Sequence, residues 1–247
     1  MNGFDMQQIK NEILDIDPKK WWGDDFDVRY YLISKLVKIK TKKILDVGGG
    51  IGIILSKSDS SNTRINLDLS FNDLIICHQK NDQKIQNICG SMTHLPFKLE
   101  CFDCVISGSV LQYAKNKDIQ NKQYYEKNGC NEYPTVEQTL LEINRVLKKN
   151  GKLFLVTPNN AYYKSYMLKY NELKYAIENH FSEYSLFFYN TFPRLSKKYR
   201  KLNLANMIPK ILSKIRNPNN IVKSLIKKDK GKGKNSVSFY VDIIKKE

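Results

Sequence analysis

The sequence predicts an α/β fold built on a mostly parallel sheet, and three observations lead to this prediction. Short apolar runs alternate with segments whose apolar residues recur every three to four positions, as in successive β–α–β units. The run at 44–47, apolar except for one acid, breaks into four glycines within the five positions 48–52. The strand-like segment at 63–68 ends in an acid, Asp68. Both features are expected at the carboxyl ends of parallel strands, where open α/β sheets bind nucleotides.

The composition limits the class of protein. A chain of 247 residues is long enough for one domain with a substantial core. It has no run of about 18 apolar residues and no signal-peptide pattern, so we expect a cytoplasmic protein. Its five cysteines include one Cys-x-x-Cys, Cys101 and Cys104, with no second pair and no neighbouring histidine motif. We therefore expect no metal site, and a buried free thiol at Cys104.

The net charge of +16 is concentrated in one segment. Residues 194–234 contain fourteen Lys or Arg and one acid, which leaves the other 206 residues with a net charge of +3. Between Leu204 and Ile226 apolar residues recur at three- and four-residue steps among basic residues, with a break at Pro218. This pattern predicts helices. Three hypotheses remain for them: packing on the sheet of their own domain, peripheral contact with an anionic membrane through 204–228, or contact with nucleic acid.

The spacing of the glycines excludes two phosphate-binding motifs. The dinucleotide fingerprint requires glycine at relative positions one, three and six; Gly48 and Gly50 fit, but the sixth position is Ile53. No Gly-Lys-Ser/Thr follows, which excludes a P-loop. The run Asp-Val-Gly-Gly-Gly-Ile-Gly at 46–52 resembles instead the first motif of class I S-adenosylmethionine-dependent methyltransferases. The cofactor of that family has no phosphate to bind.

Two further segments strengthen this resemblance on the adenosine side. Asp68 lies 20 residues after Gly48, where a carboxylate can accept both ribose hydroxyls. The family resemblance implies the same role, with Leu69 against the adenine. The segment 90–97 is similar to the family motif Gly-Asp-x-x-x-Leu-Pro-Phe, except that Ser91 replaces the acid that bonds the adenine amino group. A serine oxygen can still accept that bond, but without charge. We expect His94, in the same turn, to face solvent.

The next segment bears on the transferred methyl group. Residues 102–113 are similar to the family pattern Phe-Asp-x-Val-x-Ser-x-x-Val-Leu-x-His, with Tyr113 in place of the histidine. The resemblance implies that Ser107 and Gly108 line the methyl side of the cofactor. Asp/Asn-Pro-Pro-Tyr and Pro-Cys motifs are absent here, which disfavours enzymes that methylate nucleic-acid amines or the cytosine ring carbon. An oxygen acceptor would need a general base; Tyr113 and His94 are weak candidates, and no catalytic residue is assigned.

The resemblance extends over roughly residues 44–160. Residues 142–153 match the family pattern Glu-Ile-x-Arg-Val-Leu-Lys-Pro-Gly-Gly-x-Leu except at two positions, a mainly structural signature. Before it, Thr135 and Gln138 form a predicted capping box, and the helix that they begin should end at Asn150–Gly151. The chain is identified as a member of the class I family, in its type 11, quinone-biosynthesis-like small-molecule subgroup. This implies a Rossmann-like, seven-stranded, mostly parallel sheet with helices on both faces and an antiparallel seventh strand between the fifth and sixth.

We therefore expect one methyltransferase domain over residues 1–247. It comprises N-terminal helices in 1–43, a lid-like loop at 115–134 with Tyr124 and Tyr125 as candidate substrate contacts, and a basic insertion at 194–234 between strands six and seven. The tryptophan pair 21–22 is a candidate cover for the cofactor or substrate, or part of the core. The resemblance implies that S-adenosyl-L-methionine is bound by Asp46, which supports the turn, and by Gly48, Gly50, Gly52, Asp68, Leu69, Ser91, Met92, Ser107 and Gly108.

The expected activity is methyl transfer to a small-molecule, lipid or saccharide acceptor. Two alternatives stay open. A nucleic-acid (RNA) methyltransferase would use the basic insertion to bind its substrate. A non-catalytic cofactor-binding protein would fit Ser91 and the lack of an evident base.

Overall fold

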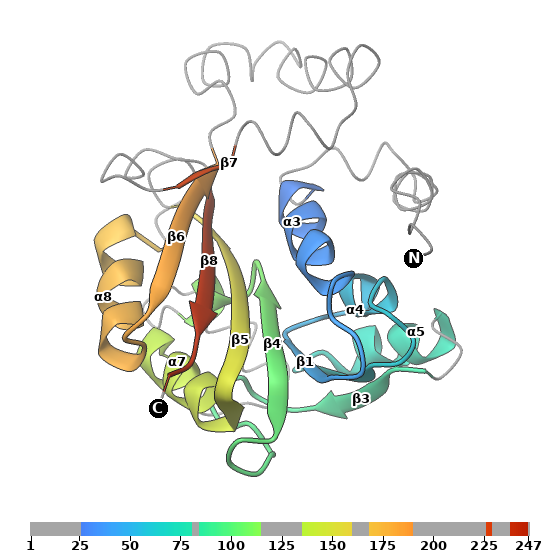
Figure 1. Ribbon diagram of the computed structural model, residues 1–247. Helices are drawn as coiled ribbons and strands as arrows, with labels where there is room; N and C mark the ends of the chain where they lie inside the picture. The colour runs from blue at the N-terminus through green and yellow to red at the C-terminus, as the bar shows by residue number, and fades with distance from the viewer. Residues whose placement is uncertain are drawn as a thin grey trace, which may run out of the picture.

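The computed structural model describes residues 26–80, 84–114, 135–159, 168–189, 226–228 and 238–246. Within them one sheet has the strand order β3-β2-β1-β4-β5-β8-β6-β7 (Figure 1). Its strands are β1 (Lys43–Val47), β2 (Thr63–Asp68), β3 (Gln86–Cys89), β4 (Phe102–Gly108), β5 (Leu147–Pro158), β6 (Tyr184–Tyr189), β7 (Ile226–Lys228) and β8 (Ser238–Ile244). The helices are α3 (Phe26–Leu36), α4 (Ile53–Ser56), α5 (Phe71–Lys80), α7 (Val136–Val146) and α8 (Tyr170–His180), with a 3₁₀ turn η1 (Leu111–Ala114).

The sheet confirms the predicted mixed topology. β3, β2, β1, β4 and β5 pair in parallel, and β8 pairs antiparallel with both β5 and β6. The last long strand of the chain therefore lies between the fifth and sixth strands, as expected. The described residues add an eighth strand, because β7 pairs antiparallel with the outer edge of β6.

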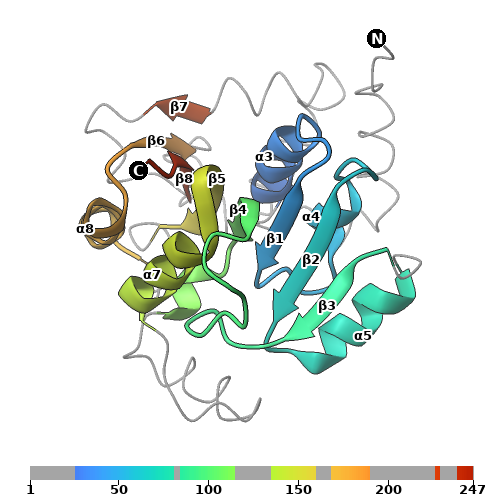
Figure 2. The ribbon, with the colours of Figure 1, turned by 60° about the horizontal axis from the view of Figure 1, so that its bottom comes forward.

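Helices cover both faces of the sheet. Figures 1 and 2 show α3, α4 and α5 on one side and α7 and α8 on the other. Successive strand residues face opposite sides; thus Ile44 packs in the core under α3 and α4, and Leu45 in the core under α7 and α8. Asp46 and Asp68 share the side of Ile44, and both are buried. The two acids singled out from the sequence therefore lie on the same side of the sheet.

A half-buried polar cluster anchors α3 to the far strands. The Tyr31 hydroxyl and the Lys35 ammonium both donate to the Asp242 carboxylate on β8. The Tyr31 ring packs on the Tyr240 ring, with centroids 4.6 Å apart. Burial and the neighbouring Asp242 charge raise the pKa of Tyr31, so its hydroxyl keeps its proton and acts as a donor. This cluster connects the first described helix to the last strand.

Three local predictions were wrong, each because a tertiary partner competes with the local pattern. The helix at 136 ends at Val146, not at Asn150–Gly151, since the N–H of Cys101 donates to the Val146 carbonyl and Leu147 pairs with Phe102 on β4. Thr135 does cap that helix, but the Gln138 amide donates to the Thr93 carbonyl instead of closing a capping box. Residues 226–228 form strand β7, not the end of a helix.

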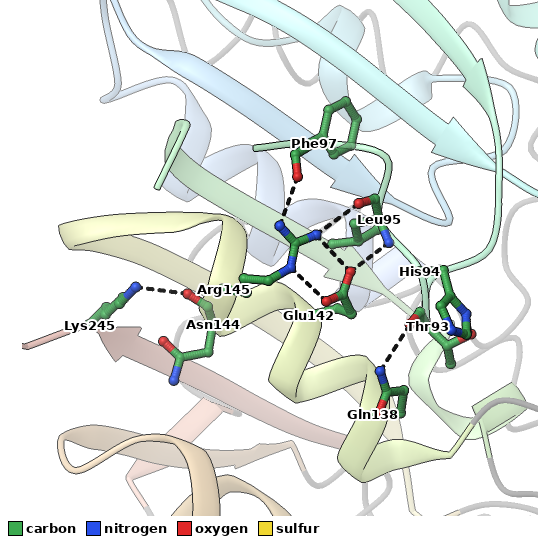
Figure 3. Close-up of polar contacts among 9 residues, drawn as sticks. All are labelled: Thr93, His94, Leu95, Phe97, Gln138, Glu142, Asn144, Arg145 and Lys245. Atoms are coloured by element: carbon green, nitrogen blue, oxygen red, sulfur yellow. Dashed lines mark hydrogen bonds and ion pairs between the residues drawn. The ribbon is translucent and has the colours of Figure 1, made fainter. Parts of the chain in front are cut away.

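α7 holds the loop that follows β3, as Figure 3 shows. The Leu95 N–H donates to Glu142 (2.8 Å), and the Arg145 guanidinium donates to the Leu95 and Phe97 carbonyls (2.8 Å each). Arg145 also forms two hydrogen bonds to the Glu142 carboxylate, of 2.7 and 2.8 Å. At the C-terminal end of α7, the Lys245 ammonium donates to the carbonyls of Asn144 and Leu147. The Glu-Ile-x-Arg signature therefore fixes loop 91–97, and its role is structural, as predicted.

Glu142→Ala should destabilise the protein, because it leaves the Arg145 guanidinium and the buried Leu95 N–H without their acceptor. We expect the free energy of unfolding at pH 7, from urea denaturation, to fall by about 2 kcal/mol, the scale of hydrogen bonds to a charged group. The hydrogen bond from Arg145 holds the pKa of Glu142 below its usual value of 4.5. The stabilisation is therefore present above that pH and is lost as the pH falls below it.

The control is Lys174→Ala, which removes an ion pair with Glu178 on α8 (3.7 Å) between two half-exposed side chains. Exposed helical pairs contribute less than about 0.5 kcal/mol. Equal losses in the two variants, or a Glu142→Ala loss that stays constant down to pH 3, would contradict the role given to the Glu142–Arg145 pair.

Candidate functional site

The glycine turn lies between β1 and α4, at the carboxyl edge of the parallel strands. Gly48, Gly50 and Gly52 have φ values of 73°, 52° and 75°, a region that side chains with a Cβ rarely adopt. A Cβ on Gly48 would also lie 2.5 Å from the Val110 side chain beyond β4, whereas nothing lies within 4 Å of the Cβ position of Gly50. Gly48 therefore allows the turn to pack closely against the exit of β4, and Gly50 leaves open space beside the turn.

Asp68 ties this turn to the end of β2. Its Oδ2 accepts the N–H of Gly50 and its Oδ1 the N–H of Ser70, both at 2.8 Å. Burial raises the pKa of Asp68, and these two hydrogen bonds oppose that rise. Each carboxylate oxygen has a second acceptor position. A buried carboxylate with acceptor capacity to spare, next to the open space at Gly50, fits a ribose with two vicinal hydroxyls.

Asp46 and Asn66 lie beneath the same turn, side by side on β1 and β2. Both residues are fully buried. The Asn66 amide donates to the Gly50 carbonyl (2.8 Å) and to Asn87 Oδ1 on β3 (3.1 Å). Both Asp46 oxygens and the Asn66 Oδ1 have no hydrogen-bond partner. Burial, with a smaller contribution from the Asp68 charge, raises the pKa of Asp46 to about 8.

The residues predicted to frame the adenine lie on two adjacent loops. Leu69 follows Asp68 directly and packs against the main core, to which the buried Met92 also belongs. The Ser91 hydroxyl is 2.9 Å from the Thr93 hydroxyl and accepts the Thr93 N–H. In the ligand-free chain Ser91 therefore stabilises its own turn, and a bond to adenine would have to share or replace those contacts. His94 is exposed.

The exit of β4 approaches the turn from the other side. Ser107, 2% exposed, donates its hydroxyl to the Val47 carbonyl (3.2 Å) across β1 and β4. Its side chain is thus occupied inside the sheet, whereas Gly108 ends the strand. Ser109 has φ 56°, a strained value for a residue with a side chain. The Ser109 carbonyl accepts the buried Gln112 amide (2.6 Å). The bend at Ser109 brings Val110 onto Gly48.

The structure brings most predicted residues together and adds others. Asp46, the glycines, Asp68 and the β4 exit meet at one sheet edge, through the contacts above. Sequence reasoning missed Asn66, Ser109 and Gln112. Only Asn66 left a signal, as a polar residue between Ile65 and Leu67 that faces the same side as Asp68. Tyr124, Tyr125 and the tryptophan pair 21–22 lie outside the described residues.

A separate hollow of about 550 Å³ lies between α5 and β3, and its lining includes Phe71, Ile75 and Cys89. None of the ten predicted cofactor residues lines it.

Comparison with known proteins agrees with this geometry. Residues 45–155 match the family model described as "Methyltransferase domain". An uncharacterized protein of Methanocaldococcus jannaschii is 33% identical over 128 residues, which cover 52% of this chain and 46% of that protein. The chain thus matches about half the length of this curated relative.

Solved structures share the fold at low sequence identity. A methyltransferase from Haloferax volcanii, solved with the Trm112 activator, has a TM-score of 0.59 at 13% identity and covers 93% of this chain and 92% of that one. Phosphoethanolamine N-methyltransferase 2 of Haemonchus contortus, solved with S-adenosyl-L-methionine, has a TM-score of 0.58 at 16% identity and covers 93% and 56%. Residues 45–155 therefore match a methyltransferase domain, and the solved structures show that the chain shares the fold of S-adenosylmethionine-dependent methyltransferases.

Proposed function

We propose that this protein transfers the methyl group of S-adenosylmethionine to a small-molecule, lipid or saccharide acceptor. The observation that carries the proposal is the Asp68 carboxylate, tied to the Gly50 N–H at 2.8 Å beside the open space at Gly50. This arrangement supplies acceptors for two hydroxyls and close backbone approach, but no lysine or P-loop for a phosphate.

The chain's own contribution would be positioning. The bound cofactor supplies an activated methyl group on a sulfonium. Asp68 would hold the ribose, Leu69 and Met92 would flank the adenine, and Gly50 would admit the amino-acid tail. The β4 exit at Gly108 would face the methyl group and direct it toward the acceptor. Holding two reactants in line is a large source of rate enhancement in itself, so the absence of an assigned base is compatible with turnover.

The strand ends that flank the basic insertion support an acceptor at an anionic surface. Tyr189, at the end of β6, pairs with both Ile226 and Ser238, so these three strand ends lie at one place. Because β6 runs parallel to β5, that place is on the same edge as the glycine turn. Membrane-facing helices combine an apolar stripe with basic residues, as 204–228 do in sequence. No helix among the described residues has the length and apolar character to cross a bilayer.

The alternative of an RNA methyltransferase rests on the charge of the same basic segment. The alternative of a non-catalytic cofactor-binding protein rests on Ser91. RNA contact would require the basic segment to bind a phosphate backbone, and it predicts steeply salt-dependent RNA binding. A binding protein without activity would retain cofactor affinity and show no turnover on any acceptor. The first experiment below tests the cofactor site, and the second separates membrane contact from RNA contact.

Asp68→Ala should remove cofactor binding, because the ribose hydroxyls lose their acceptor and Gly50 loses its tether. Calorimetric titration with S-adenosylhomocysteine should give a dissociation constant at least about 100-fold weaker than that of the wild type, as expected for the loss of two charge-assisted hydrogen bonds. Asp103→Ala is the matched control, since Asp103 is a half-buried strand carboxylate that pairs with Lys148 away from the turn. Equal affinities in the wild type and Asp68→Ala would refute the site.

Membrane contact is tested with vesicles of phosphatidylglycerol and phosphatidylcholine. Each basic residue near such a surface contributes about 1 kcal/mol, so replacing Lys210, Lys214 and Lys223 by Gln should weaken vesicle binding roughly 100-fold. The control replaces three exposed lysines outside the segment, Lys38, Lys80 and Lys149. Equal effects of the two triple substitutions, or binding to RNA in preference to the vesicles, would overturn the membrane proposal.

A further inference from the structure

Polar side chains beneath the glycine turn form a row across three strands. This row has fewer hydrogen-bond donors than acceptors. Asp46, Asn66 and Asn87 are register partners on β1, β2 and β3. The Asn66 amide uses both of its hydrogens, on Gly50 and Asn87, and the Asn87 amide donates to the Ile85 carbonyl at 3.4 Å. Three oxygens remain without a donor: both of Asp46 and Oδ1 of Asn66.

Unpaired oxygens of Asp46 and Asn66 lie close to the same point beneath Gly49. A Cβ placed on Gly49 would lie 2.2 Å from Asn66 Oδ1 and 2.7 Å from Asp46 Oδ2, so both atoms approach the same point. Two acceptors at close range in a buried site repel each other unless one of them carries a proton. Asn66 cannot carry it, because an amide oxygen is only an acceptor.

We propose that Asp46 works as a neutral acid, whose hydroxyl donates to Asn66 Oδ1 and thereby holds the glycine turn in its cofactor-binding shape. Asp46 and Asn66 are then positioning residues. The inference rests on the proposed function only in that the turn binds the cofactor.

One residue, Asn66, connects the Asp46 carboxyl group to the glycine turn. Asn66 fixes the carbonyl of Gly50, and Asp68 fixes its N–H, both at 2.8 Å. β2 thus holds Gly50 from both sides. If Asp46 loses its proton, its charge lies against Asn66 Oδ1, and the amide must turn away or release Gly50. Each Asp46 oxygen exposes less than 1 Å², so Asp46 acts through Asn66 and not by touching the cofactor.

The surroundings of Asp46 favour the neutral form. Within the described residues, the titratable groups that act on or feel its charge are Asp68 at the end of β2 and the Cys104 thiol on β4. The Asp68 charge disfavours a second carboxylate charge at Asp46, and the Cys104 thiol, whose pKa is raised by burial, carries no charge that could stabilise one. The turn and α4 cover Asp46, and residues 48–56 contain no titratable side chain. Burial raises the pKa of Asp46 to about 8, which keeps the acid mostly protonated at neutral pH.

The first test measures stability, without any cofactor. Between the unfolded pKa of 3.8 and the folded value of about 8, the native protein holds one proton more than the unfolded chain, so its stability falls as the pH rises. Asp46→Asn carries a permanent N–H donor at this place and should lack that slope. The unfolding constant of the wild type relative to Asp46→Asn should rise about tenfold per pH unit from pH 5 to 7.5.

Asp103→Asn serves as the control for this test. Asp103 accepts hydrogen bonds from the Lys43 N–H and from Lys148, and these partners hold its pKa below the usual value. Its substitution should leave the slope between pH 5 and 7.5 as in the wild type. Parallel stability profiles of the wild type and Asp46→Asn would overturn the proposal.

The second test measures the dissociation constant of S-adenosylhomocysteine from pH 7 to 9.5. The wild type should lose affinity above pH 8, by up to tenfold per pH unit, and at pH 9.5 Asp46→Asn should bind about 10-fold more tightly than the wild type. Weaker binding by Asp46→Asn at every pH would mean that the charge is required, and would overturn the proposal. If the wild type binds no cofactor but the stability profiles differ as expected, the proposed function fails and the neutral acid is supported.

Discussion

The hydrogen bond from the Gly50 amide to the Asp68 carboxylate is the contact around which the site is organised. It joins two residues that are 18 apart in sequence, and it can form because β1 and β2 pair in parallel, with Val47 opposite Leu67. The parallel pairing places both strand ends at one edge, so a turn after one strand meets an acid that ends the other. Moving the acid by one position along β2 would turn its side chain to the opposite face, and the carboxylate would point into the core under α7.

The other parts of the site depend on neighbours in the same way. Loop 91–97 is held by Glu142 and Arg145 of α7, which contact its backbone and not its side chains. The β4 exit is held by the strained Ser109 and the buried Gln112 amide. In both cases residues that would not touch a cofactor fix much of the backbone. Ser91 accepts the Thr93 N–H within loop 91–97, but the contacts from α7 to the loop do not involve the side chain at position 91.

Sequence reasoning succeeded where the information is local. The glycine turn and the acid at the end of β2 follow from residue type and short-range periodicity. It failed where a distant partner decides. Val146 ends α7 because the strand that begins at Phe102 pairs with Leu147, 45 residues away. Residues 226–228 follow a helical pattern but form a strand, because the edge of β6 is open to them. Asn66 was overlooked because its importance arises only from Asp46 and Gly50, which lie on another part of the chain.

The contrast between local sequence patterns and distant partners also explains why the cofactor is easier to infer from the sequence than the acceptor. The cofactor residues lie on strand ends and short turns that the sheet holds in register, so they form recognisable motifs. The two longest segments that would face an acceptor follow η1 and β6, after residues 114 and 189. Both follow strands that end at the carboxyl edge, and the pairings of β1, β2, β4 and β5 are formed by the described strands alone. The residues of these strands therefore carry no information about the acceptor. The proposal of an acceptor at a negatively charged surface rests instead on the charge of 194–234.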